Sequence, residues 1–170
     1  MLRMIAQKTV VEAVADLCRR ANTDLRPDVE RGLEAAWRHE TDSRGRRILK
    51  AIRDNARDAR EKKLAVCQDT GLPIIFVKMG EGARVTGGLE KAVQAGVVAG
   101  YKKGYLRASV IRDPLERGAS GFGPAIVHVD LVPGDRLGLT VLPKGFGCEN
   151  KSRLVMLRPT QGWCDIKEFV

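Results

Sequence analysis

Residues 125–142 read AIVHVDLVPGDRLGLTVL, and this stretch sets the fold class of the second part of the chain. Hydrophobic and polar residues alternate through 125–132 and again through 136–142, which is the two-residue period of a strand with one buried face. Between the two runs, Pro133 fixes φ and Gly134 permits a positive φ, which is typical of a tight turn. The sequence therefore predicts a β-hairpin over 125–142.

A further strand and a helix are predicted before this hairpin. Residues 74–79 (IIFVKM) are mainly β-branched, aromatic or long apolar residues bounded by glycine and proline, which indicates a strand. Residues 88–103 follow a helical period and place Gly96 and Gly100 one turn apart. Each glycine costs about 1 kcal/mol of helix propensity relative to alanine, so we expect another element to pack closely against this helix.

The first third of the chain is predicted to be helical. Residues 8–21 carry an apolar stripe of helical spacing, with Cys18 on the stripe as a buried core thiol. A second helix is expected from Pro27 to near Glu40, and Ser43 is placed to cap a third helix that is rich in basic residues.

The expected architecture is an α+β fold in a single domain spanning residues 1–170. A helical bundle (residues 1–63) is expected to pack on a mixed α/β part (residues 64–170) that contains the hairpin.

The charge of the chain raises the question of nucleic-acid binding, because clustered Lys and Arg bind phosphates without regard to sequence. The formal net charge is +9, and the segment from Arg44 to Lys63 holds nine basic and three acidic residues. Apolar residues recur at helical spacing within that segment, which favours the solvated face of an amphipathic helix. No nucleic-acid partner is therefore expected, although a basic nucleic-acid-binding domain stays open as a third interpretation.

Composition and the N-terminus bound the cellular context. The chain is 44% hydrophobic and 30% charged and has no run of about 18 uncharged apolar residues, so no membrane partner is expected. Glu12 and Asp16 interrupt the apolar N-terminal positions, and no small-residue cleavage site follows, unlike a secretory signal. We expect a cytoplasmic protein.

Two segments are candidates for chemistry rather than for scaffold. The first, VCQDTG (66–71), lies between the basic helix and a strand, where a loop can present polar groups. Cys67 offers a soft thiolate for iron, Gln68 a neutral donor and Asp69 a charged acceptor. The alternative is a capped turn with a buried thiol.

The second segment is KGFGCENKS (144–152), directly after the last predicted strand. Glycines at such a place let backbone N–H groups point at an anion, and Lys144 and Lys151 add positive charge. A tight connection without a site is the alternative. The four cysteines form no CxxC pair, so any metal site must be assembled by the fold.

Taken together, four sequence words resemble one enzyme family. They resemble the α-subunit, or N-terminal region, of class I iron–sulfur fumarate hydratases and the related L-tartrate dehydratases, with fumarase the closer fit. The words cover nearly the whole chain: CQDTG (67–71), KKGYLRASVIRDPLER (102–117), PAIVHVDLVPGD (124–135) and LPKGFGCENKSRLVMLRPTQG (142–162).

The resemblance implies reversible hydration of a small dicarboxylate, with fumarate or malate expected and tartrate possible, at a [4Fe–4S] cluster whose open iron acts as a Lewis acid. It implies that Cys67 is a cluster ligand and that Gln68 and Asp69 contact substrate, with Asp69 as a catalytic residue. It also implies that Arg107 clamps a substrate carboxylate, and that Gly147 offers its backbone to the substrate.

The chain also departs from the family pattern. Phe146 and Cys148 stand where the family loop KGGGS has glycine and serine, and Cys148 and Cys164 are weighed as replacement ligands but not favoured. The family's other two cluster cysteines are expected outside this chain. The chain is therefore expected to be inactive alone and to need the rest of the α-subunit, or a β-subunit, in a homo- or hetero-oligomer. A catalytically incompetent remnant or binding module of the same fold is the alternative from another class.

Overall fold

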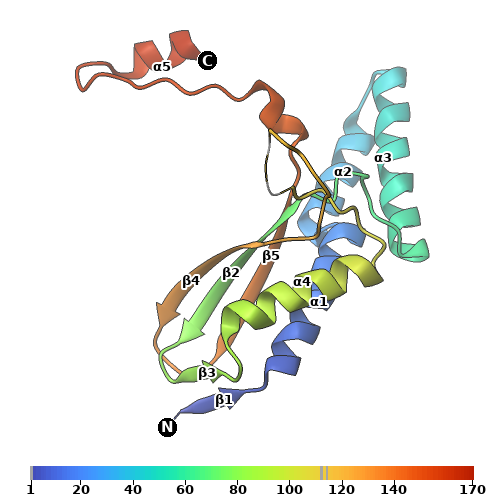
Figure 1. The fold of residues 1–170 in the computed structure, drawn as a ribbon. Coiled ribbons are helices and arrows are strands. Elements are labelled where there is room, and N and C mark those ends of the chain that lie inside the picture. Colours follow the sequence, from blue (N-terminus) through green and yellow to red (C-terminus); the bar gives the residue numbers. More distant parts are fainter. Residues whose placement is uncertain (1, 112, 114) are drawn as a thin grey trace.

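The protein has an α+β fold, as predicted, in a computed structural model that describes residues 2–111, 113 and 115–170 (Figure 1). Helices and strands are both present in each half of the chain. The elements follow in the order β1 (Arg3–Ile5), α1 (Gln7–Thr23), α2 (Pro27–His39), α3 (Ser43–Lys62), β2 (Leu72–Gly80), β3 (Ala83–Val85), α4 (Leu89–Lys103), β4 (Ile126–Val132), β5 (Leu137–Lys144), the 3-10 helix η1 (Gly147–Lys151) and α5 (Trp163–Phe169).

The main sheet has three strands in the order β4-β2-β5. The central strand β2 pairs parallel with β4 and antiparallel with β5, so that Phe76 lies between His128 and Thr140. The prediction of a hairpin over 125–142 is therefore wrong in its pairing. The two strands are present and a tight link joins them, but β2 lies between them.

The link between β4 and β5 spans the end of β2 and is hydrogen-bonded to it. The backbone N–H groups of Gly80 and Gly82 donate to the carbonyls of Arg136 and Gly134, each at 2.8 Å. A Cβ atom on Gly80 would lie 2.6 Å from the Gly134 carbonyl oxygen, so only glycine lets the link cross here. These bonds compensate for the absence of direct pairing between β4 and β5. They depend on residues far from the turn, which a local pattern does not reveal.

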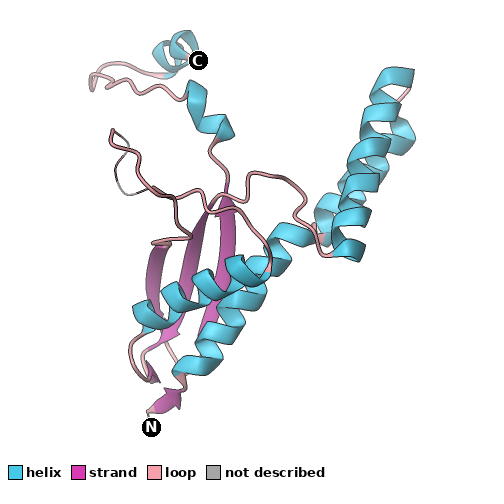
Figure 2. Ribbon diagram, turned by 45° about the vertical axis from the view of Figure 1, so that its right-hand side comes forward, coloured by secondary structure: helices cyan, strands magenta, loops and turns pink. Residues whose placement is uncertain are grey.

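One face of the sheet is covered by α1 and α4 (Figure 2). Gly96 and Gly100 allow the close approach of α1 that their spacing predicted: a Cβ on Gly100 would lie 2.7 Å from the Ala15 carbonyl oxygen. Cys18 is fully buried in this layer, which confirms the prediction of a core thiol. The buried apolar core comprises Val10, Val14, Cys18, Ile75, Val77, Val85, Ala92, Val93, Val97, Tyr101, Leu106 and Ala125.

The other two N-terminal helices project from this body (Figures 1 and 2). Whereas a bundle of three helices was expected, α1 packs mainly on α4 and β5, and α2 pairs with α3. No described residue of α2 is buried. The cap of α3 is Asp42, whose carboxylate accepts the Gly45 N–H at 2.8 Å, and not Ser43 as predicted.

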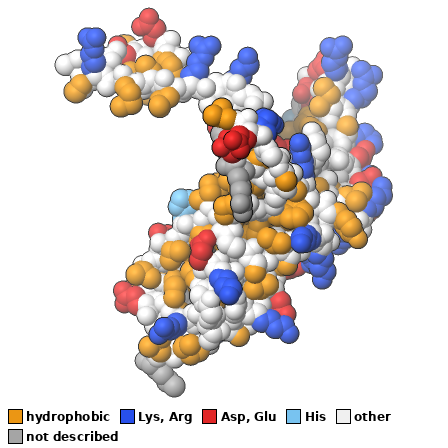
Figure 3. Space-filling model, viewed as in Figure 1, with side chains coloured by type: hydrophobic (Ala, Val, Ile, Leu, Met, Phe, Trp, Pro, Cys, Tyr) orange, Lys and Arg blue, Asp and Glu red, His pale blue; other side chains and the backbone are white. Residues whose placement is uncertain are grey.

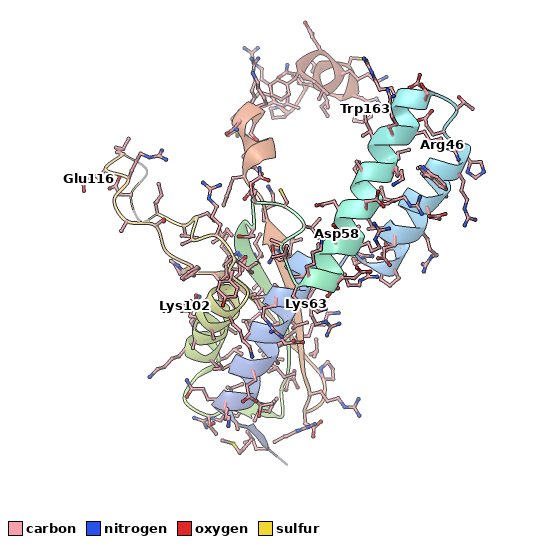
Figure 4. All side chains as sticks on the ribbon, turned by 90° about the vertical axis from the view of Figure 1, so that its right-hand side faces the viewer. Arg46, Asp58, Lys63, Lys102, Glu116 and Trp163 are labelled. Carbon is pink, nitrogen blue, oxygen red and sulfur yellow. The ribbon has the colours of Figure 1, made fainter. Side chains whose placement is uncertain are left out.

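Apolar side chains remain exposed in two places. The outer face of the sheet presents Phe76, Ile126 and Leu142, and the segment from residue 153 to the C-terminus extends away from the body (Figure 1). Trp163 in α5 lies on that segment and is exposed (Figure 4). Among the described helices, none combines the length and apolar character that a bilayer crossing requires.

Candidate functional site

The loop that carries Cys67 begins where two helices hold it. The Val66 N–H donates to the Asn22 carbonyl of α1 at 2.8 Å, and the Asn55 side chain of α3 donates to the Val66 carbonyl at 2.9 Å. Cys67 follows at the surface, and its thiol donates to the Gln68 side-chain oxygen at 3.4 Å. The alternative of a buried thiol at this position is therefore wrong. The exposed sulfur is accessible to a metal or cofactor.

Asp69 connects this loop to the glycine-containing loop after β5. Its carboxylate accepts the Phe146 N–H at 3.0 Å and the Gly71 N–H at 3.2 Å. A Cβ on Gly145 would lie 2.9 Å from the same carboxylate, so a larger residue at that position would require the Asp69 side chain to shift. Two segments far apart in the sequence are thus joined through one side chain.

The same contacts determine the charge of Asp69. The hydrogen bond from the Phe146 backbone holds the pKa of Asp69 below its ordinary value, although desolvation by partial burial opposes this shift. The backbones of Gly71 and Gly147 and the positive charge of Arg107 lower the pKa further. Asp69 is therefore ionised at neutral pH. It can accept hydrogen bonds from a ligand but is a weak base.

Arg107 lies on the segment that follows α4. Its backbone N–H donates to the Thr70 hydroxyl at 3.0 Å, and the Thr70 side chain is buried. The guanidinium is exposed and acts electrostatically on Asp69. The sequence analysis did not assign a role to Thr70. Its position next to Asp69 in the CQDTG word is the feature of the sequence that could have indicated one.

The structure thus brings the three sequence-predicted segments together at one end of the sheet. Asp69 contacts the loop that contains Gly147, and Arg107 is tied to the residue after Asp69. Gly147 has open space beside its Cα, because a Cβ there would meet nothing within 4 Å. Gln68 precedes Asp69 and is exposed. An ionised carboxylate, a guanidinium and accessible backbone can together recognise a small polar anion.

Lys144 is engaged within its own loop. Its ammonium lies 2.6 Å from the Glu149 carboxylate and 5.9 Å from the centre of the Phe146 ring. The hydrogen bonds from Lys144 and Ser152 hold the pKa of Glu149 below its ordinary value. Part of the positive charge predicted for this loop is therefore compensated by Glu149.

A complete metal site is not formed by the described residues. Among them, no three His, Cys, Asp or Glu side chains gather in a way that could hold a metal ion. Cys18 is buried, and burial raises the pKa of its thiol to about 12, whereas Cys164 is exposed on α5. The side chain of Cys148 lies outside the described part of the chain. Cys67 alone therefore offers a thiolate at the candidate site within the residues that the structure describes.

Comparison with known proteins gives consistent matches over nearly the whole chain. The sequence model described as "Fumarate hydratase (Fumerase)" matches residues 11–170. The "Putative L(+)-tartrate dehydratase subunit alpha" of Methanocaldococcus jannaschii is 32% identical over 169 residues, covering 95% of this chain and 59% of that protein. The "L(+)-tartrate dehydratase subunit alpha" of Escherichia coli (strain K12) is 29% identical over 169 residues, covering 97% and 56%. The chain thus spans somewhat more than half the length of these relatives.

Proposed function

Because this chain belongs to the fumarate hydratase (Fumerase) family, we propose that it is the part of a hydro-lyase α-subunit that binds a small dicarboxylate. The family assignment confirms the resemblance seen in the sequence words. The proposal places the dicarboxylate beside Asp69, Arg107 and Gly147, and fumarate or malate and tartrate are the substrates to be tested.

The observation that carries the proposal is the convergence of these residues from three separate segments. The planar guanidinium of Arg107 is suited to a bidentate contact with one carboxylate, and the backbone at Gly147 is accessible to the same ligand. Asp69 stays ionised and accepts a hydrogen bond from the substrate hydroxyl, while Gln68 donates from its amide. Asp69 is a candidate catalytic residue through this contact, which orients the substrate hydroxyl, because its lowered pKa makes it a weak proton acceptor.

The cofactor of the proposed reaction is a [4Fe–4S] cluster, with Cys67 as one of its ligands. Such a cluster, when bound, supplies a Lewis acid that polarises the hydroxyl of the substrate. The exposed Cys67 thiol fits the role of a single ligand. The described residues do not provide a complete set, so the remaining ligands would have to come from elsewhere in the assembly.

We further propose that the chain acts together with other polypeptide segments. The relatives are named as alpha subunits, which implies a β-subunit partner in those proteins. The exposed apolar residues of the outer sheet face and of the C-terminal segment are suited to such contacts, and Figure 3 shows those of the C-terminal segment. A catalytically incompetent binding module of the same fold is the second candidate, and the iron content of the assembled protein separates the two.

The basic surface of α3 carries several ion pairs with carboxylates. Lys50 lies 2.6 Å from Asp54, and Lys62 lies 2.8 Å from Asp58. Arg53 also pairs with Glu34 of α2. Pairs of this kind are typical of a solvated helix surface.

Iron content and turnover, measured on one anaerobic preparation of the assembled enzyme, test the proposal. Cys67→Ser is expected to lower iron content and turnover together, because it removes a ligand. Arg107→Lys is expected to keep the iron and to lower kcat/KM for fumarate or L-tartrate, with a loss of about 2–4 kcal/mol of transition-state stabilisation, because lysine lacks the planar fork.

Two results would contradict parts of this proposal. A near-normal kcat/KM for Arg107→Lys would rule out the carboxylate clamp. Retention of the full cluster by Cys67→Ser would rule out the ligand assignment. The matched control is Cys164→Ser, because Cys164 is also exposed but lies on α5. This substitution is expected to change neither the iron content nor the turnover.

A further inference from the structure

Two hydroxyl groups are buried beneath the candidate site, and the family comparison gives neither of them a role. They belong to Thr70, which is 2% exposed, and Tyr101, which is 1% exposed. Thr70 lies in the loop before β2, and Tyr101 lies in the last turn of α4. Valine or phenylalanine would fill the same space without a hydroxyl, so burial alone does not account for these polar groups.

The two residues form a chain of hydrogen bonds that ends on Arg107. The Tyr101 hydroxyl donates to the Thr70 carbonyl at 2.8 Å. The Thr70 hydroxyl accepts the Arg107 N–H at 3.0 Å and lies 3.4 Å from the Arg107 carbonyl, to which it donates. Arg107 is therefore held at both of its backbone polar groups by one side chain.

The segment that contains Arg107 depends on such side-chain contacts, because it lies outside the regular elements. Helix α4 ends at Lys103, and β4 does not begin until Ile126. Leu106 is buried, and its N–H donates to the Tyr101 carbonyl at 2.9 Å. The Ser109 hydroxyl adds a contact of 3.4 Å to the carbonyl of Gly71.

Asp69 and Thr70 thus divide two tasks between adjacent positions. The Asp69 side chain holds the loop after β5 through the Phe146 N–H, and the Thr70 side chain holds the segment after α4 through Arg107. The dipeptide therefore links the two segments, in addition to the pairing of β2 with β5 and the contact of Ser109 with Gly71. The Tyr101 hydroxyl holds the backbone of that dipeptide through its hydrogen bond to the Thr70 carbonyl.

We propose that Thr70 and Tyr101 are positioning residues, which set the place of Arg107 relative to Asp69 and thereby the geometry of anion binding. The proposal rests on the proposed function in so far as Arg107 binds a carboxylate. Neither residue touches the ligand. Both act through the backbone to which Arg107 belongs.

Amide hydrogen exchange of the chain tests the hydrogen bonds themselves. In Thr70→Val the protection of the Arg107 amide is expected to fall at least about tenfold, since its acceptor is removed. Thr70→Ser keeps the hydroxyl and is expected to stay within about threefold of the parent chain. Unchanged Arg107 protection in Thr70→Val would overturn the proposal.

A matched control exists at the opposite end of the molecule. The exposed Thr86 hydroxyl likewise accepts a distant backbone N–H, that of Gln7 at 3.1 Å, and lies 3.4 Å from the Ile5 carbonyl. Thr86→Val is expected to lower the protection of Gln7 and leave Arg107 unchanged. If the Arg107 amide lost protection equally in Thr70→Val and Thr86→Val, the loss would reflect general destabilisation of the fold. That result would overturn the positioning role of Thr70.

Ligand binding by the same variants gives the functional readout. Thr70→Val and Tyr101→Phe are expected to raise the Kd for fumarate or L-tartrate about three- to tenfold, with recovery in Thr70→Ser. Tyr105→Phe is the control, because Tyr105 is 95% exposed. Unchanged affinity in both variants would overturn the positioning role. If the parent chain binds no dicarboxylate, the proposed function fails, and amide exchange alone decides the positioning of Arg107.

Discussion

Two regions of the molecule, the body and the projecting helical hairpin of α2 and α3, are each stabilised by a different kind of contact. The body, formed by the sheet with α1 and α4, buries an apolar core that includes Val14, Val97 and Tyr101 at no more than 1% exposure. The hairpin, formed by α2 and α3, has no buried residue in α2 and is joined by charged groups. Figure 3 shows Lys and Arg side chains along these projecting helices.

The hairpin contacts include several between charged groups. The Arg60 guanidinium bonds to both Asp24 and Glu30. The guanidinium groups of Arg46 and Arg53 lie 4.6 and 4.4 Å from the centre of the Trp37 ring. Exposed ion pairs contribute about 0–1 kcal/mol each, far less than a packed core. The hairpin is therefore expected to open at a lower free energy than the body.

The candidate site lies where these two regions meet. The chain leaves α3 at Lys63 (Figure 4) and is fixed at Val66 by both α1 and α3 before it enters β2. Thr70 and Asp69 are then held by the body and by the loop after β5. Arg107 and Asp69 are therefore attached to the body, which is expected to open at the higher free energy. Cys67 lies nearer the α2–α3 hairpin, which is expected to open first.

The largest effect is expected from an added methyl group in the body. In Gly100→Ala, the new Cβ would meet the Ala15 backbone at 2.7 and 2.9 Å, which cannot yield as a flexible side chain can. We expect a loss of about 1–3 kcal/mol of unfolding free energy despite the better helix propensity of alanine.

The hairpin provides the matched control for that substitution. Gly32 is also a helical glycine, but a Cβ there would meet nothing within 4 Å. Gly32→Ala is therefore expected to stabilise α2 by up to about 1 kcal/mol. Urea unfolding of both variants measures the difference. If both substitutions changed the unfolding free energy in the same direction and by the same amount, the distinction between a packed surface at Gly100 and an open surface at Gly32 would be wrong.

An intermediate effect is expected when the aromatic contact of the hairpin is removed. Trp37→Ala takes away two cation–π contacts, worth about 0.5–1 kcal/mol each at exposed sites. Amides of α2 and α3 should then exchange faster, while amides of α1 and α4 keep their protection. Trp163→Ala, at an exposed position of α5, is the control and should change neither set. Uniform loss of protection would show that the two regions unfold as one unit.

The smallest perturbation uses the cysteines as probes of the two environments. Burial raises the pKa of the Cys18 thiol from 9.0 to about 12, so in the folded chain it stays protonated and inaccessible at pH 8. Iodoacetamide followed by peptide mass spectrometry should modify Cys67 and Cys164, which are exposed, and spare Cys18.

The same shift predicts a dependence of stability on pH. The neutral Cys18 thiol is favoured in the folded state, so its contribution is fully present below about pH 9 and is lost as the pH rises toward 12. Cys18→Ala should remove this part of the alkaline loss. Rapid modification of Cys18 at pH 8 in the folded chain would contradict the burial on which both expectations rest.

Periodic patterns in the sequence predicted the long elements well, because the patterns are set by local burial. The stripe of residues 8–21 corresponds to α1, and the glycine pair in α4 does allow close helix packing. The pairing of β4 with β2, and the short pair β1 and β3, depend on contacts across many residues. The alternation of residues 125–142 does not indicate that β2 lies between β4 and β5.

The site was predicted in part for the same reason. The sequence words gave Cys67, Asp69 and Arg107 their expected roles, whereas the hydroxyl groups of Thr70 and Tyr101 contact the backbone of residues far away in the sequence. The capping role of Asp42 was missed because Ser43 next to it has the same preference, and only the geometry separates them. Roles that depend on a side-chain hydroxyl meeting a distant backbone require the fold.

Titration of the isotope-labelled chain with fumarate and with L-tartrate, followed by amide chemical shifts, tests the central claim most directly. The account predicts that saturable shifts concentrate at Gln68, Asp69, Arg107 and Gly147, and that Arg107→Lys weakens them while Arg84→Lys, at an exposed position of β3, does not. Non-specific attraction to the basic hairpin would instead shift amides of α3 and disappear with added salt. Shifts confined to α3, or none at saturating dicarboxylate, would contradict the assignment of this site.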